Sequence, residues 1–170
     1  RKIMKKTLVI FLAVLLPSLA FAQGKGPKTG LRFGINTGYV FATTESGWFN
    51  NWNWDVTLGS QVFPWFYVGG GAGMDVYTGI DGETPLDLPV FGQMKFFVPL
   101  SGIVQPYLDV RGGYAFSLKK WEDAGIISAS VGIEIAGHWN VSLGYDAHIY
   151  SSNGIAGTAH GMVARIGYRF

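Results

Sequence analysis

Hydrophobic and polar residues alternate along most of the chain between residues 31 and 170. Side chains two residues apart in a strand share a face, so this alternation predicts strands with one apolar and one polar face. Residues typical of turns divide the pattern into eight such segments. The predicted strands cover residues 31–42, 52–63, 68–79, 86–98, 105–118, 126–136, 139–151 and 158–170.

The connections between the predicted strands are of two kinds. Those after the second, fourth and sixth strands are compact or rich in turn residues, as in the segment AGHW at 136–139. Those after the odd-numbered strands are polar, as in KKWEDAG at 119–125. Each strand reaches the roughly 9–11 residues that a tilted strand needs to cross a bilayer. The predicted fold is therefore all-β, a closed, eight-stranded, antiparallel up-and-down transmembrane β-barrel.

Charged residues in the predicted strands occupy the face opposite the apolar one. A soluble barrel such as a lipocalin keeps its apolar face inside, but ten charges over eight strands are too few for a surface in water. An eight-stranded barrel is just wide enough for side chains to fill its interior. We therefore predict an apolar exterior and an interior ionic network, with Asp87 assigned to the loop beside it. The predicted members of this network are Arg32, Asp55, Asp75, Lys95, Asp109, Arg111, Glu134, Asp146, His148, Arg165 and Arg169.

Ionic side chains inside a barrel need partners, because an unpaired buried charge costs on the order of several kcal/mol. A continuous ionic interior predicts a closed barrel without an open pore. Positions relative to the connections suggest three pairs, which are Lys95 with Asp109, Arg111 with Glu134, and Asp146 with Arg165.

Composition supports a membrane-embedded β-structure. Hydrophobic residues make up 48% of the 170 residues and charged residues only 14%, whereas a soluble surface needs roughly 25–35% charged residues. The 25 glycines and an aromatic content of 15% favour short strands and tight turns over helices. The absence of cysteine excludes disulfides, metal–thiolate sites and a cysteine-linked lipid anchor.

The first 22 residues have the pattern of a cleavable signal peptide. Met4, the expected start, precedes two lysines and the apolar run TLVIFLAVLLPSLAFA, which ends in an A-x-A cleavage pattern. We therefore divide the chain into a signal peptide at 1–22, a leader at 23–30 and a barrel at 31–170, with Sec-type export. Without the signal peptide the chain keeps nine basic and eleven acidic residues, so no basic surface for nucleic acid remains.

Aromatic residues gather toward both ends of the predicted strands, as expected for the two interfacial girdles of a membrane barrel. The segment 43–51 and its flanks are also typical of a binding loop, although an interfacial anchor is the simpler interpretation. The aromatic residues assigned to the interfaces or loops are Trp48, Phe49, Trp52, Trp54, Trp121 and Trp139.

Signal peptide, eight strands, short turns and the terminal YRF together resemble the superfamily of small eight-stranded outer-membrane β-barrels, of which OmpA and OmpX are types. The glycine-rich strands resemble the porin-like barrel proteins of Bacteroidetes. The resemblance implies a monomer in the outer membrane of a Gram-negative bacterium, in contact with outer-membrane lipids and lipopolysaccharide. It also implies a C-terminal signal read by the barrel-assembly machinery, at Ala164, Ile166, Tyr168 and Phe170.

Enzymatic chemistry is the main alternative function, because some eight-stranded barrels act on lipid A with a serine, a histidine and an acid near the outer rim. Candidates here are Asp146, His148, Ser151, Ser152 and His160. Ser151 falls on the face opposite Asp146 and His148, and the His-x-Ser arrangement of the lipid A deacylase family is missing. Metal-ligand spacing is absent as well. We therefore expect no catalytic residues, no metal site and no cofactor.

The run GGGAG at 69–73 resembles a phosphate-binding loop only superficially. It lacks the Gly-Lys-Ser/Thr ending of such a loop and does not open a helix. A strand without side-chain bulk, which lets a bulky neighbour pack closely, is the better interpretation.

The sequence thus predicts an integral outer-membrane protein with a closed, non-conducting interior and a structural or surface-interaction role in the cell envelope. One alternative is a lipid A-modifying enzyme, which replacement of His148 and an assay of lipid A acyl chains would distinguish. The other is a soluble, secreted barrel that binds a small apolar ligand, which cell fractionation would distinguish.

Overall fold

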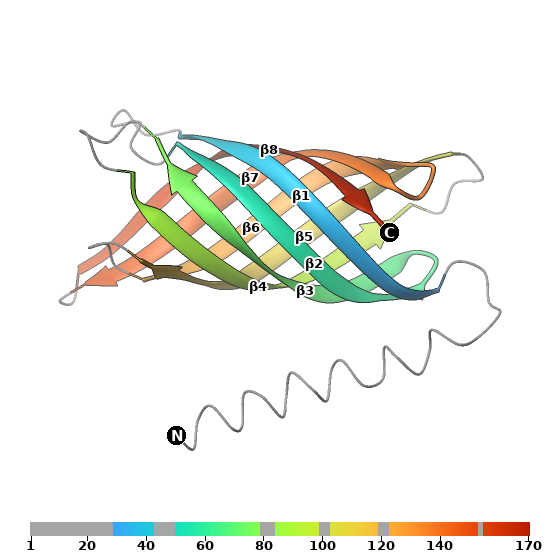
Figure 1. Cartoon of the computed structure of the whole chain (residues 1–170), viewed down its shortest axis with the longest axis horizontal. Coiled ribbons are helices and arrows are strands. Elements are labelled where there is room, and N and C mark those ends of the chain that lie inside the picture. The colour runs from blue at the N-terminus through green and yellow to red at the C-terminus, as the bar shows by residue number, and fades with distance from the viewer. Residues whose placement is uncertain (1–28, 43–49, 79–83, 99–102, 119–122, 153–154) are drawn as a thin grey trace, which may run out of the picture.

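The computed structural model describes residues 29–42, 50–78, 84–98, 103–118, 123–152 and 155–170, without the side chains of residues 42 and 151–156. The predicted signal peptide and most of the predicted leader lie outside the described residues. The strands are β1 (Gly30–Ala42), β2 (Asn51–Phe63), β3 (Phe66–Tyr77), β4 (Leu86–Phe97), β5 (Val104–Ser117), β6 (Ala124–Ile135), β7 (Trp139–Ser152) and β8 (Ile155–Arg169). Each strand pairs antiparallel with the next, and β8 pairs with β1 to close the barrel (Figure 1). Among these residues no helix is long and apolar enough to cross a membrane.

The predicted fold class is confirmed, and the largest differences, of two or three residues, lie at the starts of β3, β6 and β8 and at the end of β3. β3 begins at Phe66 and β8 at Ile155, where the alternation predicted starts at 68 and 158. In both hairpins the antiparallel pairing continues into residues next to the turn, as in the pair Ser152 and Ile155. A hydrogen-bonded ladder can extend beyond the residues whose side chains alternate clearly, so the pattern places the starts of these two strands too late.

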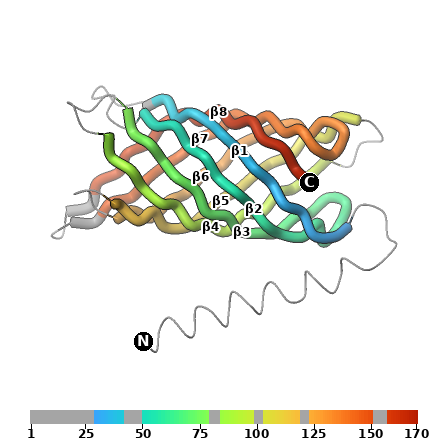
Figure 2. Tube along the Cα trace, in the orientation of Figure 1, coloured from blue at the N-terminus to red at the C-terminus, as the bar shows by residue number. Residues whose placement is uncertain are grey.

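The connections separate onto the two ends of the barrel. The links β2–β3 and β6–β7 lie at the same end as the C-terminus, which we call the turn end (Figure 2). The last residues of β1, β3, β5 and β7 and the first residues of β2, β4, β6 and β8 lie at the opposite end, which we call the loop end. The strands run obliquely to the long axis, as closure of a sheet into a barrel requires.

The faces of the strands are inverted relative to a soluble protein. Along β2 buried and exposed residues alternate, with Asn53 and Asp55 buried and Trp54 and Val56 exposed. The same arrangement is found on β4, where Lys95 is buried and Met94 is exposed. The interior is therefore polar and the exterior is apolar.

Two small apolar clusters lie at the two ends of this polar interior. At the loop end, Val40, Tyr77, Ala159 and Val163 pack together, with Tyr150 against them. At the turn end, Tyr67, Phe97 and Tyr107 form the second cluster. We call these the loop-end cluster and the turn-end cluster.

Glycines make room for the large side chains inside the barrel. A Cβ added at Gly71 would lie 2.6 Å from the ring of Phe91, so the bulky neighbour predicted for the GGGAG run is this phenylalanine. A Cβ added at Gly69 would lie 2.5 Å from the hydroxyl of Tyr67. The interior of an eight-stranded barrel is narrow, so each large ring needs a facing position without a side chain.

Gly113 and Gly112 offer a matched test of this packing. A Cβ at the inward-facing Gly113 would lie 2.1 Å from the carbonyl oxygen of Val90, whereas one at the outward-facing Gly112 meets nothing closer than 4.0 Å. We expect Gly113→Ala to lower the free energy of unfolding by about 1–3 kcal/mol, and Gly112→Ala to change it by less than about 0.5 kcal/mol. Urea unfolding in detergent micelles, followed by tryptophan fluorescence, measures both values. Equal losses in the two variants would contradict the packing described.

Candidate functional site

The barrel interior collects the charged side chains of all eight strands and is the candidate functional site. Of the residues predicted for the interior ionic network, Arg32 on β1 is half-buried. The other ten are buried, namely Asp55, Asp75, Lys95, Asp109, Arg111, Glu134, Asp146, His148, Arg165 and Arg169. Burial of this many ionic groups is tolerated only where they pair or accept hydrogen bonds.

Arg111 is the centre of the middle part of the interior. Its guanidinium donates to Asp55 at 2.9 Å and to Asp109 at 3.2 Å, and it lies 5.0 Å from the ring centre of Phe91. Asn36 donates a further hydrogen bond to Asp55 at 2.6 Å, and Gln93 donates to Asp109 at 2.8 Å. Both carboxylates are therefore held by a charged donor and an amide donor.

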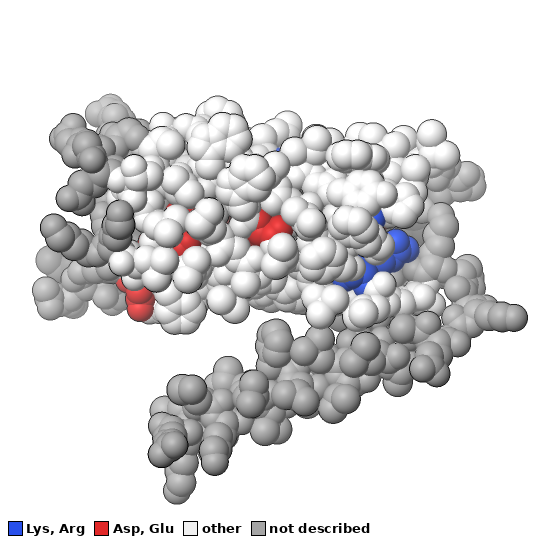
Figure 3. Space-filling model, viewed as in Figure 1, with Lys and Arg blue, Asp and Glu red and all other residues white. Residues whose placement is uncertain are grey.

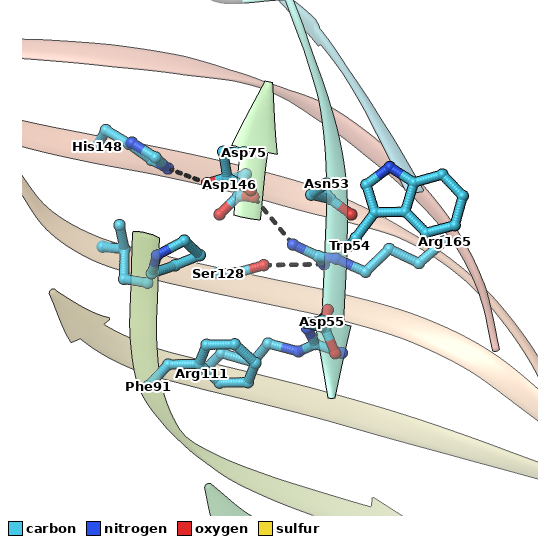
Figure 4. Close-up of a pocket in the computed structure, with 12 residues that line it drawn as sticks. Asn53, Trp54, Asp55, Asp75, Phe91, Arg111, Ser128, Asp146, His148 and Arg165 are labelled. Carbon is cyan, nitrogen blue, oxygen red and sulfur yellow. Dashed lines mark hydrogen bonds and ion pairs between the residues drawn. The ribbon is translucent and has the colours of Figure 1, made fainter. Parts of the chain in front are cut away.

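Arg165 is held beside this group by β6 and β7. It donates to Asp146 at 2.9 Å and to the hydroxyl of Ser128 at 3.1 Å, and Figure 4 shows both contacts next to Asp55 and Arg111. The space between these side chains measures about 30 Å³. Such a cavity has room for water but not for an organic ligand.

The turn end of the interior is basic and aromatic. Arg169 pairs with Glu134 and lies over the rings of Tyr67 and Phe97, at 4.6 and 5.5 Å from their centres. Lys95 lies 4.6 Å from the ring centre of Tyr107. Because Arg169 and Lys95 also pair with Glu134 and Asp109, these cation–π contacts link the turn-end cluster to the ion pairs of the interior.

Two of the three predicted ion pairs form, and the third is wrong. Lys95 lies 3.9 Å from Asp109, and Arg165 pairs with Asp146. Arg111 does not pair with Glu134, because the β5–β6 register places Arg111 opposite Ser128 and Glu134 six residues further along the strand. The prediction measured depth from a connection at 119–125, but β5 ends at residue 117 and β6 starts at 124. The partner expected for Arg111 was therefore placed too far along β6.

Asp87 is a second correction. The sequence assigned it to a loop, but it lies in β4 directly opposite Asp75 of β3 and is 1% exposed. Tyr77 donates a hydrogen bond to it at 2.9 Å. The signal was present in the sequence, because Asp87 shares the strand face of Lys95.

A linked group of side chains lies beneath the loop-end cluster, and we call it the outer cluster. The Tyr77 hydroxyl, which donates to Asp87, lies 3.2 Å from Nδ1 of His148, and Nε2 of His148 lies 4.0 Å from Asp75. The outer cluster therefore consists of Asp75, Tyr77, Asp87 and His148. Sequence reasoning missed Tyr77, since nothing in the local pattern sets it apart from other inward-facing aromatic residues.

Acidic and basic groups are separated along the barrel. Figure 3 shows acidic atoms toward the loop end and basic atoms toward the turn end of the visible face. The residues agree, since Asp75 and Asp87 lie near the loop end of their strands, and Arg169 lies at the turn end. The interior thus carries opposite charge excesses at its two ends.

Aromatic residues predicted for the membrane interfaces lie on the exterior of the barrel where they are described. Trp52 and Trp54 are exposed near the loop end and Trp139 is exposed at the turn end, whereas Trp48, Phe49 and Trp121 lie outside the described residues. At the turn end the predicted assembly-signal residues Ala164, Ile166, Tyr168 and Phe170 alternate with buried ones and so face outward. The ring centre of Tyr168 lies 4.9 Å from that of Phe170 and 5.0 Å from that of Trp139, so these three aromatic side chains pack together.

Of the candidate catalytic residues whose side chains are described, His160 is separated from Asp146 and His148. Asp146 and His148 are buried in the interior, whereas His160 lies on the outward face of β8 and contacts the hydroxyl of Tyr145. The side chains of Ser151 and Ser152 lie outside the described residues. Within the described part of the chain, no three His, Asp or Glu side chains are grouped to hold a metal ion.

Comparison with known proteins relates this chain to solved structures only. No protein-family model and no curated protein sequence matches it. Neisserial surface protein A superposes with a TM-score of 0.63 at 11% identity, over 82% of this chain and 95% of that one. The N-terminal β-barrel domain of Pseudomonas aeruginosa OprF gives 0.53 at 8% identity, over 82% and 97%. The outer membrane enzyme PagL gives 0.53 at 12% identity, over 79% and 97%.

The fold is that of the small outer-membrane β-barrels. Its neighbours include both a surface protein and an enzyme, so the shared architecture carries no activity with it. The sequence pattern predicted this resemblance, and the superpositions confirm it at the level of the fold.

Arg111 and Arg32 offer a matched test of the ionic interior. Arg111→Met would leave Asp55 and Asp109 without their shared guanidinium, so we expect it to lower the free energy of unfolding by about 3–5 kcal/mol. Arg32 is half-buried and makes no ion pair within the described residues, so Arg32→Met should cost less than about 1 kcal/mol. Urea titration in detergent measures both. Similar losses in the two variants would show that the pairs at Arg111 do not stabilise the barrel.

Proposed function

We propose that this chain is an integral outer-membrane protein whose barrel crosses the bilayer with its apolar exterior in lipid. The observation that carries the proposal is the exposure of large apolar side chains around the barrel. Val131 is 64% exposed, Leu143 61% and Trp54 52%, while the charged residues of the strands face inward. A soluble barrel would expose this surface to water and aggregate, which argues against the soluble, ligand-binding alternative.

The interior is proposed to be closed and non-conducting. Three layers block the path along the axis, namely the loop-end cluster, the ionic groups around Arg111 and Arg165, and the turn-end cluster. The space left among the ionic groups is about 30 Å³, and the arginines that line it are held by carboxylates. An ion that entered would have to break these pairs, which are costly to break in a low-dielectric interior.

The role that fits a closed barrel is structural support of the envelope or interaction at its surface. We propose that the loop end faces outward and the turn end faces the periplasm, as in barrels with short periplasmic turns. Partners would then be outer-membrane lipids and lipopolysaccharide, with the barrel-assembly machinery reading the aromatic turn-end strand during biogenesis. We also propose that the protein is a monomer and that it is exported through its N-terminal signal peptide.

A lipid A-modifying activity is the less favoured function. His148 is 2% exposed and contacts Tyr77 inside the barrel, so a lipid on the exterior cannot reach it. His160 does face outward, but the side chain it contacts is the Tyr145 hydroxyl and not a serine or a carboxylate, so this pair lacks the parts of a serine, histidine and acid set. We therefore propose that the protein is not an enzyme, and the assay of lipid A acyl chains in a His148 variant remains the discriminating measurement.

Cell fractionation tests the location. We expect the mature protein in the detergent-extracted outer membrane, with a gel mobility that changes on heating because a closed barrel resists detergent unfolding. The control is a soluble periplasmic protein processed in parallel. Recovery of the chain in the soluble periplasmic fraction would contradict the proposal and favour the ligand-binding alternative.

Planar-bilayer recording tests the closed interior. Purified protein reconstituted at neutral pH is expected to give no large steady conductance, because the two apolar clusters and the ion pairs block the axis. A general porin reconstituted in the same lipid serves as the positive control. A stable current of porin size would contradict a closed interior while leaving the membrane location intact.

A further inference from the structure

The side chains described at the turn end carry more positive than negative charge. Glu134 attracts both Arg32 and Arg169, but it forms an ion pair only with Arg169. The third cation at this end, Lys95, lies 3.9 Å from its own partner Asp109. Among the described residues Arg32 therefore has no carboxylate of its own, so the turn end has one cation that an external anion could neutralise.

One side of the Arg169 guanidinium is held in place and the other has an unused donor. Nη1 donates to Glu134, and the guanidinium carbon lies 4.6 Å from the ring centre of Tyr67 and 5.5 Å from that of Phe97. Nη2 is buried and donates to no described group, although Arg169 is only 4% exposed. Because a buried donor without an acceptor is costly, an acceptor oxygen beside Nη2 would stabilise this end of the barrel.

Arg32 lies beside this guanidinium at the seam between β1 and β8. Arg169 pairs with Gly34 in the ladder, and Arg32 is the next residue of β1 on the same inward face. Residues in such a diagonal relation lie on the order of 7–8 Å apart, within reach of long side chains. Arg169 is also the cation that acts most strongly on Arg32. An oxyanion held by both guanidinium groups would relieve their repulsion.

The seam gives an anion a route to these arginines. Pairing of β1 with β8 begins at Gly34, followed only by the bond from the Phe170 N–H to the Phe33 carbonyl at 2.8 Å, so residues 30–32 have no partner on the β8 side in the described ladder. Figure 3 shows basic atoms at the surface of this part of the barrel. Of the cations described at the turn end, Arg32 alone is not buried. Its unpaired side chain is therefore accessible and free to move.

The surroundings of the seam favour a phosphate group that belongs to a lipid. The planar donors of guanidinium groups match the oxygens of phosphate. The exposed rings of Phe33 and Phe170 lie beside the seam with their centres 5.7 Å apart, and Tyr168 and Trp139 continue this aromatic surface. Such rings lie at the level of the headgroups in a membrane. Acyl chains packed on them would leave a headgroup phosphate at the level of Arg32.

We propose that Arg32 and Arg169 form a phosphate-binding site at the β1–β8 seam, in which phosphate oxygens accept from the guanidinium of Arg32 and from Nη2 of Arg169. The source that the position favours is the headgroup of an anionic phospholipid, and this source rests on the membrane orientation proposed above. Free phosphate would use the same donors. Glu134 opposes the anion, but its charge is already taken up by Nη1 of Arg169. Binding moves the Arg32 side chain and changes no covalent bond.

Lipid binding to the purified protein in detergent micelles tests the site. Native mass spectrometry counts the phosphatidylglycerol and phosphatidylcholine molecules that the folded barrel retains. We expect the wild type to hold one phosphatidylglycerol in preference to phosphatidylcholine, and Arg32→Gln to bind it at least about tenfold more weakly, because hydrogen bonds between charged groups are lost. Lys120→Gln, which removes one positive charge from the segment between β5 and β6, is the matched control and should bind as the wild type does.

Inorganic phosphate distinguishes the two sources of the anion. Arg32-dependent binding of phosphate as tight as that of phosphatidylglycerol would support the site with free phosphate as its ligand, whereas phosphatidylglycerol that phosphate does not displace supports the lipid. Equal binding of phosphatidylglycerol by the wild type and Arg32→Gln would overturn the proposal. A gel mobility that changes on heating shows that each variant is folded. Failure of the membrane location would appear in cell fractionation instead, so the two failures are distinguishable.

Side-chain ¹⁵N spectra of labelled arginines provide a second measurement on the wild type. After the predicted signal peptide the chain has four arginines, which are Arg32, Arg111, Arg165 and Arg169. Added phosphatidylglycerol should shift the signals of Arg32 and Arg169. Those of Arg111 and Arg165 should stay, because carboxylates hold both in the middle of the interior. No shift at all, or equal shifts of all four signals, would refute the site whatever the variants show.

Discussion

The narrow interior of an eight-stranded barrel is the constraint on which the rest of this structure depends. With an apolar exterior, every ionic side chain of the strands must enter a space only wide enough for side chains to fill. Charges there are tolerated only in pairs, which is why Arg111 lies between Asp55 and Asp109 and Arg165 beside Asp146. The same lack of space explains the glycines, since a ring such as Phe91 needs a bare strand opposite it.

The distribution of charge along the axis gives the two ends different properties. Cations at the turn end lie over aromatic rings, as Arg169 lies over Tyr67, and this end combines pairing with cation–π contact. At the loop end the carboxylates Asp75 and Asp87 face each other, and among the described residues neither lies within 4.0 Å of a lysine or arginine. The two ends are therefore stabilised in different ways, one by rings and ion pairs and the other by hydrogen bonds through Tyr77 and His148.

A filled interior also bears on where the protein can act. The cavity beside Arg111 and Arg165 has a volume of only about 30 Å³, and His148 is buried, so the surface interaction proposed for this protein would take place outside the barrel interior. The fold that this chain shares with Neisserial surface protein A and with the enzyme PagL does not decide its function, because function depends on individual sites and not on the architecture.

Alternation in the sequence by itself determined the strands, their number and which face of each is polar, because a period of two is a local property of extended backbone. It also found Lys95–Asp109 and Asp146–Arg165, whose partners lie on strands adjacent in the chain. Only the tertiary structure decided the contacts that cross the interior, such as Arg111 of β5 with Asp55 of β2 and His148 of β7 with Tyr77 of β3. These contacts join strands that are not neighbours, so they depend on the register of every strand pair between them and on closure of the barrel. A local alternation of residues does not determine these registers.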